Sequence, residues 1–128
     1  MTSLSTPLTT SASYSPVAVA NGLAFVAGQA AIGPDGTVVA PNDAYEQSIY
    51  TFGLISDILG QIGSDLTRVA SATVFITHVS HLVNFNRAWL LAFPEHKPAR
   101  ATVVCGLLVE GLVVEIQVVA VAPEEVTA

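Results

Sequence analysis

The sequence predicts an α+β fold in which a mixed β-sheet carries two helices on one face. Short β-branched apolar runs between turn residues indicate strands, and two segments with apolar residues at three- and four-residue steps indicate amphipathic helices. Their order along the chain is β-β-(β)-α-β-α-β-β. With 128 residues and no visible repeat or linker, we expect one domain over residues 1–128, of which 1–13 form a polar leader.

The first half of the sheet is predicted from turn signals. Val17–Ala20 and Leu23–Gly28 are β-prone runs separated by Asn21-Gly22, a strong short-range hairpin signal. Gly33–Gly36 forms a second cluster of turn residues. Thr37–Val39 follows it, and we expect a brief strand or an extended edge there.

The first helix is predicted over residues 42–62. Asn42 or Asp43 can cap its N-terminus, and Gly63 ends it. The apolar residues with helical spacing are Ile49, Phe52, Ile55, Leu59 and Ile62.

The second half of the chain continues the alternation of strands and helices. Val69–Ile76 is an apolar, β-branched run typical of a buried strand. A second helix is predicted from about Ser80 to Phe93, with Pro94 as its stop. Arg100–Leu107 and Leu112–Val121 are the two closing strands.

Composition excludes several classes of function. The net charge is −6 with only four lysines and arginines, which argues against nucleic acid and against an anionic membrane as partners. Hydrophobic residues make up 52% of the chain, yet no run of about 18 apolar residues occurs, so we expect burial between subunits. The leader has no signal-peptide pattern, and we place the protein in the cytoplasm.

Two charged residues stand inside apolar strands, Arg100 and Glu115. An unpaired buried charge is costly, so each either faces solvent or has a partner. Folding the last two strands into a hairpin about Leu108 and Val109 would set Thr102 opposite Glu115, with Arg100 as a diagonal neighbour. A guanidinium and a carboxylate would then meet in one pocket, provided that the register is correct.

The chain resembles members of the RidA/YjgF family, the reactive intermediate (enamine/imine) deaminases. The resemblance spans nearly the whole chain, and its most specific element is Pro98-Ala99-Arg100 with a glutamate fifteen residues later. The other matching segments are Tyr14-Ser15, Gly28-Gln29, Gln47, Ala72–Ile76, Asn86 and Val114-Glu115-Ile116.

The resemblance implies a chorismate-mutase-like (YjgF-type) subunit in a homotrimer, with pockets at the subunit interfaces. It also implies that Arg100 grips a substrate carboxylate and that Glu115 positions and activates the attacking water. It implies no metal and no organic cofactor. The remaining substrate-binding positions that it assigns are Tyr14, Gly28, Asn86 and the main chain at Thr102.

The implied reaction is hydrolysis of a small carboxylate-bearing imine or enamine, such as 2-aminoacrylate or 2-iminobutyrate, to a 2-keto acid and ammonia. Ala27, Gly53 and Thr102 replace a serine, an asparagine and a cysteine that are frequent in the family. One alternative is therefore a pathway-specific relative that acts on another unsaturated amine, such as an aminomuconate. Another is a non-catalytic trimer that binds 2-keto acids as a regulator.

Overall fold

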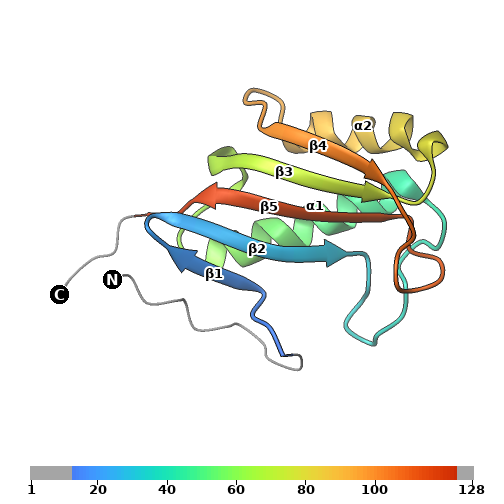
Figure 1. Ribbon diagram of the computed structural model, residues 1–128, viewed down its shortest axis with the longest axis horizontal. Coiled ribbons are helices and arrows are strands. Elements are labelled where there is room, and N and C mark those ends of the chain that lie inside the picture. Colours follow the sequence, from blue (N-terminus) through green and yellow to red (C-terminus); the bar gives the residue numbers. More distant parts are fainter. Residues whose placement is uncertain (1–12, 124–128) are drawn as a thin grey trace.

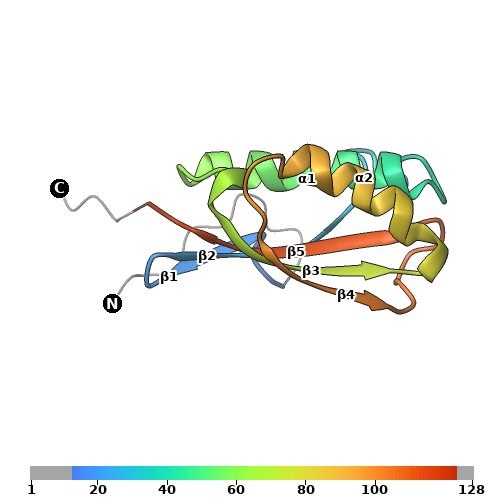
Figure 2. The same ribbon diagram turned by 90° about the horizontal axis from the view of Figure 1, so that it is seen from above.

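The protein is a single layer of β-sheet with two helices packed against one of its faces, as the sequence predicts (Figures 1 and 2). The structure is a computed structural model and describes residues 13–123, so the predicted leader lies outside the described residues except for Ser13. The strand order is β1-β2-β5-β3-β4. The elements are β1 (Val17–Ala20), β2 (Leu23–Ala30), α1 (Ala44–Gln61), η1 (Leu66–Arg68), β3 (Val69–Ile76), η2 (Val79–His81), α2 (Leu82–Ala92), β4 (Ala99–Val104) and β5 (Val114–Val121).

The predicted opening hairpin is present. Asn21 and Gly22 both have positive φ angles, 53° and 76°, as a two-residue hairpin turn with the twist of its strands requires. Strand β2 continues to Ala30, two residues beyond the predicted end. The segment expected as a brief strand forms only one bridge, between Ile32 and Val38.

Asp43 caps α1 by accepting a hydrogen bond of 2.9 Å from the amide of Glu46.

The helices meet the sheet through an apolar core. Four aromatic rings fill the space between α1 and α2, where Phe93 lies 5.6 Å from Phe52 and 4.6 Å from Trp89, centroid to centroid. The fourth ring belongs to Phe85, which is fully buried. Edge-to-face and tilted packing of this kind adds to the free energy gained by burial.

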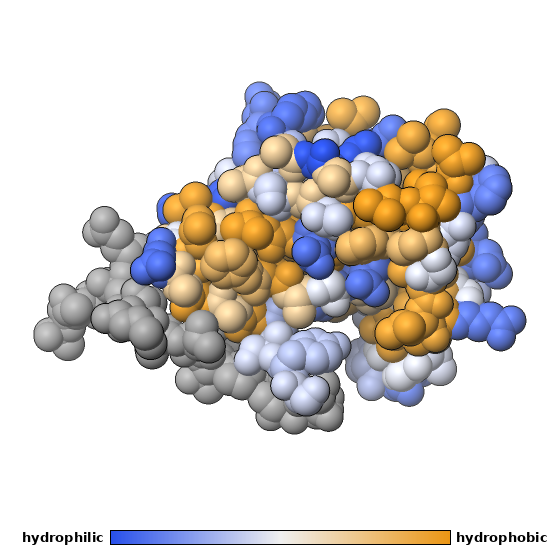
Figure 3. Space-filling view, viewed as in Figure 1, coloured by the Kyte–Doolittle hydropathy of each residue, from blue (hydrophilic) through white to orange (hydrophobic). Residues whose placement is uncertain are grey.

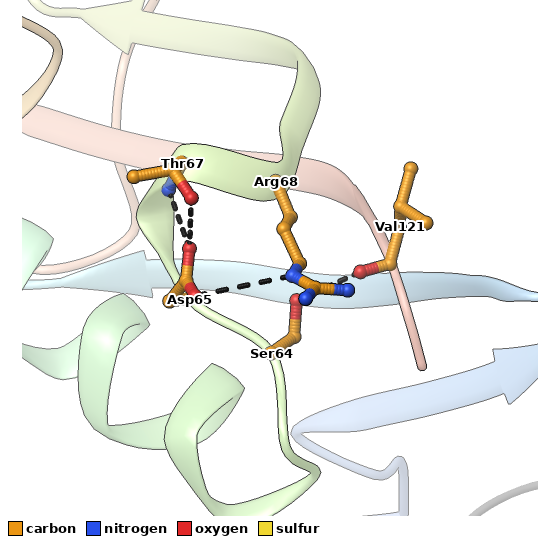
Figure 4. A network of polar contacts seen from close by, with 5 residues as sticks. All are labelled: Ser64, Asp65, Thr67, Arg68 and Val121. Carbon is orange, nitrogen blue, oxygen red and sulfur yellow. Dashed lines mark hydrogen bonds and ion pairs between the residues drawn. The ribbon is translucent and has the colours of Figure 1, made fainter. Parts of the chain in front are cut away.

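A short polar network ties the start of β3 to the end of β5 (Figure 4). Asp65 accepts hydrogen bonds from the amide of Thr67, at 2.9 Å, and from its hydroxyl group. These bonds hold the pKa of Asp65 below its ordinary value. Ser64 donates to the carbonyl of Val121 at 2.7 Å, and Arg68 Nε lies 3.9 Å from Asp65 Oδ2.

The predicted hairpin between the last two strands is wrong. Strand β3 lies between them, with β4 parallel on one side and β5 antiparallel on the other. The cause is the connection through α2, which carries the chain back over the helical face and adds β4 parallel to β3 at the sheet edge. Thr102 therefore does not stand opposite Glu115. Phe75 is the residue opposite Glu115, and Val103 is opposite Phe75.

Candidate functional site

A cavity of about 470 Å³ opens beside the second half of β2. Strand β1 pairs with β2 as far as Val17 opposite Val26, and the amide of Ala27 donates to the carbonyl of Pro16 at 2.9 Å, so the described chain before β1 leaves this edge of β2 unpaired from Gly28 onward. Tyr14 and Glu115 reach this cavity from the chain before β1 and from β5. The cavity thus unites three residues that the sequence singled out, Tyr14, Gly28 and Glu115.

Gly28 leaves room for the carboxylate of Glu115 in the position that the structure shows. The register between β2 and β5 shifts between Val26 and Gln29, which brings Gly28 under the carboxylate. A Cβ atom on Gly28 would lie 2.5 Å from Glu115 Oε2, closer than real atoms approach. Within residues 13–123, no hydrogen bond or ion pair engages the Glu115 carboxylate, which is therefore free to act on a ligand.

The loop that forms one wall of the cavity is held in place by Gln47. This side chain is fully buried in α1. Its Nε2 donates to the carbonyls of Ala40, at 3.1 Å, and Gly111, at 2.8 Å. Its Oε1 accepts from the amide of Val113 at 2.9 Å. The clamp fixes where the chain enters β5, two residues before Glu115.

Arg100 lies elsewhere, on the face of the sheet that carries the helices. Its guanidinium carbon is 4.8 Å from the ring centroid of Trp89 and 5.2 Å from that of Phe85. These are cation–π distances. Partial burial lowers the pKa of Arg100, but a guanidinium remains protonated at neutral pH. Among the described residues no carboxylate pairs with Arg100, so the rings orient the cation without neutralising it.

Strand β4 offers its backbone as well as Arg100. The amide of Cys105 donates to Ile76 on β3 at 3.0 Å. Because backbone groups alternate in direction along a strand, Arg100, Thr102 and Val104 turn their N–H and C=O groups to the free edge. Thr102 therefore presents a donor and an acceptor beside Arg100. Asn86, half-buried on α2, follows Phe85 directly in the chain.

The residues around Glu115 and those around Arg100 lie on opposite faces of one sheet. Arg100 is opposite Ala72, which is buried under the helices, whereas Glu115 is opposite Phe75 on the uncovered face. The expectation that Arg100 and Glu115 meet in one pocket of one chain is therefore wrong. It assumed a direct pairing of β4 with β5, and the intervening β3 changes both the distance and the face.

The sequence does not predict the roles of two side chains, Gln47 and Trp89. Gln47 is a polar residue on the apolar side of α1, a pattern that indicates a buried hydrogen-bonding role. Trp89 is buried in the core, and no sequence pattern indicates that Arg100 lies on its ring. His78 accepts a hydrogen bond from the amide of Ser80 at 3.0 Å. In residues 13–123 no three His, Cys, Asp or Glu side chains cluster as metal ligands would, and no helix is long and apolar enough to span a membrane.

Comparison with known proteins identifies the family. The family model described as Endoribonuclease L-PSP matches residues 5–122. The chain belongs to this family, which is the RidA/YjgF family. Among RidA/YjgF relatives, a RutC family protein of Haemophilus influenzae is 35% identical over 112 residues, covering 86% of this chain and 91% of that protein.

Solved structures share the fold of this chain. Yeast Mmf1 superposes with a TM-score of 0.83 at 30% identity, covering 95% of this chain and 98% of that one. The Rid-family protein YyfA from Yersinia pestis gives a TM-score of 0.80 at 32% identity, with 86% and 88% covered. The predicted YjgF-type fold is thus confirmed.

Proposed function

We propose that this protein hydrolyses small carboxylate-bearing imines and enamines to 2-keto acids and ammonia, at a site shared by two copies of the chain. The observation that carries the proposal is the separation of two half-sites with opposite charge. One holds Glu115 in a cavity, and the other holds Arg100 on an aromatic platform. Neither charge has an ion-pair partner among the described residues, and each suits one end of such a substrate.

Arg100 serves as the carboxylate anchor. Its planar guanidinium offers two parallel N–H groups to a carboxylate, which a lysine cannot do. Trp89 and Phe85 restrict its orientation, so less side-chain entropy is lost when the ligand binds.

The main chain of Thr102 holds the attacking water, and Glu115 positions and activates it. The substrate reacts as the protonated imine: the water oxygen forms a bond to the imine carbon, the π electrons of the C=N bond move to the nitrogen, and Glu115 accepts a water proton. The resulting carbinolamine carries its nitrogen as an amine, and Glu115 returns the proton to that nitrogen. The C–N bond then breaks and its electron pair leaves with ammonia, while Glu115 takes the hydroxyl proton and the hydroxyl oxygen becomes the keto oxygen. That proton leaves with ammonia as ammonium. No oxidant or reductant is consumed.

The shared site requires that the Glu115 face of one copy meet the Arg100 edge of the next. Such a head-to-tail interface closes into a ring, and we propose a homotrimer. The uncovered sheet face supports association because apolar side chains gather there (Figure 3). By strand register, Leu23, Phe25, Phe75, Val103, Val119 and Val121 belong to this face.

The endoribonuclease of the family description is a weaker candidate for this chain. A groove for RNA needs cations along the phosphate backbone, and this chain has four lysines and arginines against ten acidic residues. A site with one arginine and one carboxylate fits a small monoanion better.

The test compares Arg100→Ala, Glu115→Gln and an equal mixture of the two after dissociation and reassembly. Imines are generated in situ, and their hydrolysis is followed as keto acid and ammonia. We expect Arg100→Ala to raise KM strongly and Glu115→Gln to lower kcat roughly 10²-fold. In random mixed trimers, about a quarter of the interfaces regain both residues, so about a quarter of the activity should return.

The same experiment separates the competing ideas. No recovery in the mixture would place both residues in one chain and overturn the shared site. Unchanged hydrolysis by Glu115→Gln, with 2-keto acids still bound, would instead favour a regulatory protein without turnover.

A further inference from the structure

The wall of the cavity beyond Glu115 is apolar. It includes Leu54 from α1, Ile32 from the loop after β2 and Leu112 from the loop before β5. Leu112 is buried, whereas Leu108 at the opening is fully exposed. The lining of the cavity thus includes both buried and exposed apolar side chains. Of the described residues that line it, Glu115 alone carries a charge.

Leu54 is free to contact a ligand. It is half-buried on α1, but it does not belong to the cluster of apolar side chains that forms the core between sheet and helices. Its exposed surface lines the cavity instead. A change at Leu54 should therefore alter what the cavity binds more than it alters folding.

We infer that the substrate is a monocarboxylate imine with a branched apolar side chain, and that Leu54 determines this specificity. The inference rests on the proposed function. Carboxylate, imine nitrogen and side chain all radiate from one carbon atom. With the carboxylate on Arg100 and the imine carbon beside Glu115, the side chain faces Leu54 and Leu112. Burial against them is favourable in proportion to its apolar area.

In a single chain, without the copy that would supply Arg100, the cavity has room for a substrate larger than an alanine- or serine-derived imine. Its volume of about 470 Å³ falls in the range of roughly 300–1,000 Å³ that holds drug-sized ligands. A three-carbon acid would leave most of the apolar wall in contact with water. A branched side chain covers that wall and displaces the water.

Among the described residues that line the cavity, one chain supplies no cation for the second carboxylate of a dicarboxylate such as an aminomuconate. A second carboxylate would need a second cation, because burying an unpaired charge costs several kcal/mol. The other three cationic residues of the chain, Arg68, Arg87 and Lys97, do not line the cavity. Glu115 would also repel the second carboxylate.

The first experiment measures the affinity of the assembled protein for 2-keto acids by calorimetry. We expect 4-methyl-2-oxopentanoate to bind about 15- to 60-fold more tightly than pyruvate, since two to three further carbon groups are buried at ~0.8 kcal/mol each. We expect 2-oxoglutarate to bind at least about 10-fold more weakly than 2-oxopentanoate, which has the same chain length but lacks the second carboxylate. Equal affinities, or preference for 2-oxoglutarate, would overturn the inference.

The second experiment tests Leu54 directly. Leu54→Ala should weaken binding of 4-methyl-2-oxopentanoate about 5- to 10-fold and leave pyruvate unchanged. Leu54→Arg should invert the preference toward 2-oxoglutarate. Leu90→Ala is the matched control, because Leu90 is an exposed helical leucine away from the cavity. A Leu54→Ala variant with the wild-type affinity ratio would refute the role of Leu54.

These measurements do not depend on turnover. A protein that shows the affinity series but hydrolyses no imine would refute the proposed function and leave the inferred ligand class standing. A protein that hydrolyses imines but binds all the keto acids equally would refute the inferred ligand class and leave the proposed function standing.

Discussion

Replacing Gln47 by leucine removes the clamp between α1 and the loop before β5. The amide of Val113 loses its bond to Gln47, and because Val113 is buried, its N–H is left without a partner at a cost of about 1–3 kcal/mol. The carbonyls of Ala40 and Gly111 keep one bond each, from Asp43 and Asn42, so each loss costs only about 0.5–1.5 kcal/mol. We expect Gln47→Leu to destabilise the protein by about 3 kcal/mol, a large share of a typical domain stability.

Urea denaturation at fixed protein concentration measures this loss. Gln61→Leu is the matched control, since Gln61 lies at the end of the same helix and is exposed, and we expect a change within about 0.5 kcal/mol. Hydrogen exchange should show faster exchange at residues 111–113 in Gln47→Leu alone. A Gln47→Leu variant as stable as Gln61→Leu would refute the reasoning that the three bonds hold the loop.

Three further predictions concern the site, the assembly and the response to pH. Gly28→Ala should displace the Glu115 carboxylate and lower kcat roughly 10²-fold with little loss of stability, whereas Gly53→Ala, which meets open space within α1, should stabilise the fold by roughly 0.5–1 kcal/mol; equal activities of the two would contradict the role of Gly28. Light scattering should give three times the chain mass of 13.3 kDa, and a monomer at micromolar concentration would exclude the shared site. Thr67→Val should raise the lowered pKa of Asp65 toward its ordinary value of 3.8 in an NMR titration. Because the folded-state pKa lies below the unfolded one, the associated stability is complete at neutral pH and disappears as the pH falls through the folded pKa, so wild type and variant should converge in acid.

The sequence determined the local elements of this protein because their signals are local. Asn21-Gly22 specified the first hairpin, and Asp43 specified the start of α1. The helical spacing of Phe52, Ile55 and Leu59 placed these side chains in the core, where the structure has them. Hydrogen-bonding caps, left-handed φ angles and helical periodicity depend on residues a few positions apart, so a linear reading contains them.

Only the tertiary structure decided how the strands pair and therefore which residues can act together. The sequence identified both charged residues, Arg100 and Glu115, but pairing them needed the order of β3, β4 and β5, which depends on the crossover through α2. The last two strands in the sequence, β4 and β5, are separated in the sheet by β3, and Arg100 and Glu115 lie on opposite faces. Successive side chains of a strand point to opposite faces of the sheet. An error of one residue in the predicted pairing therefore assigns a side chain to the wrong face.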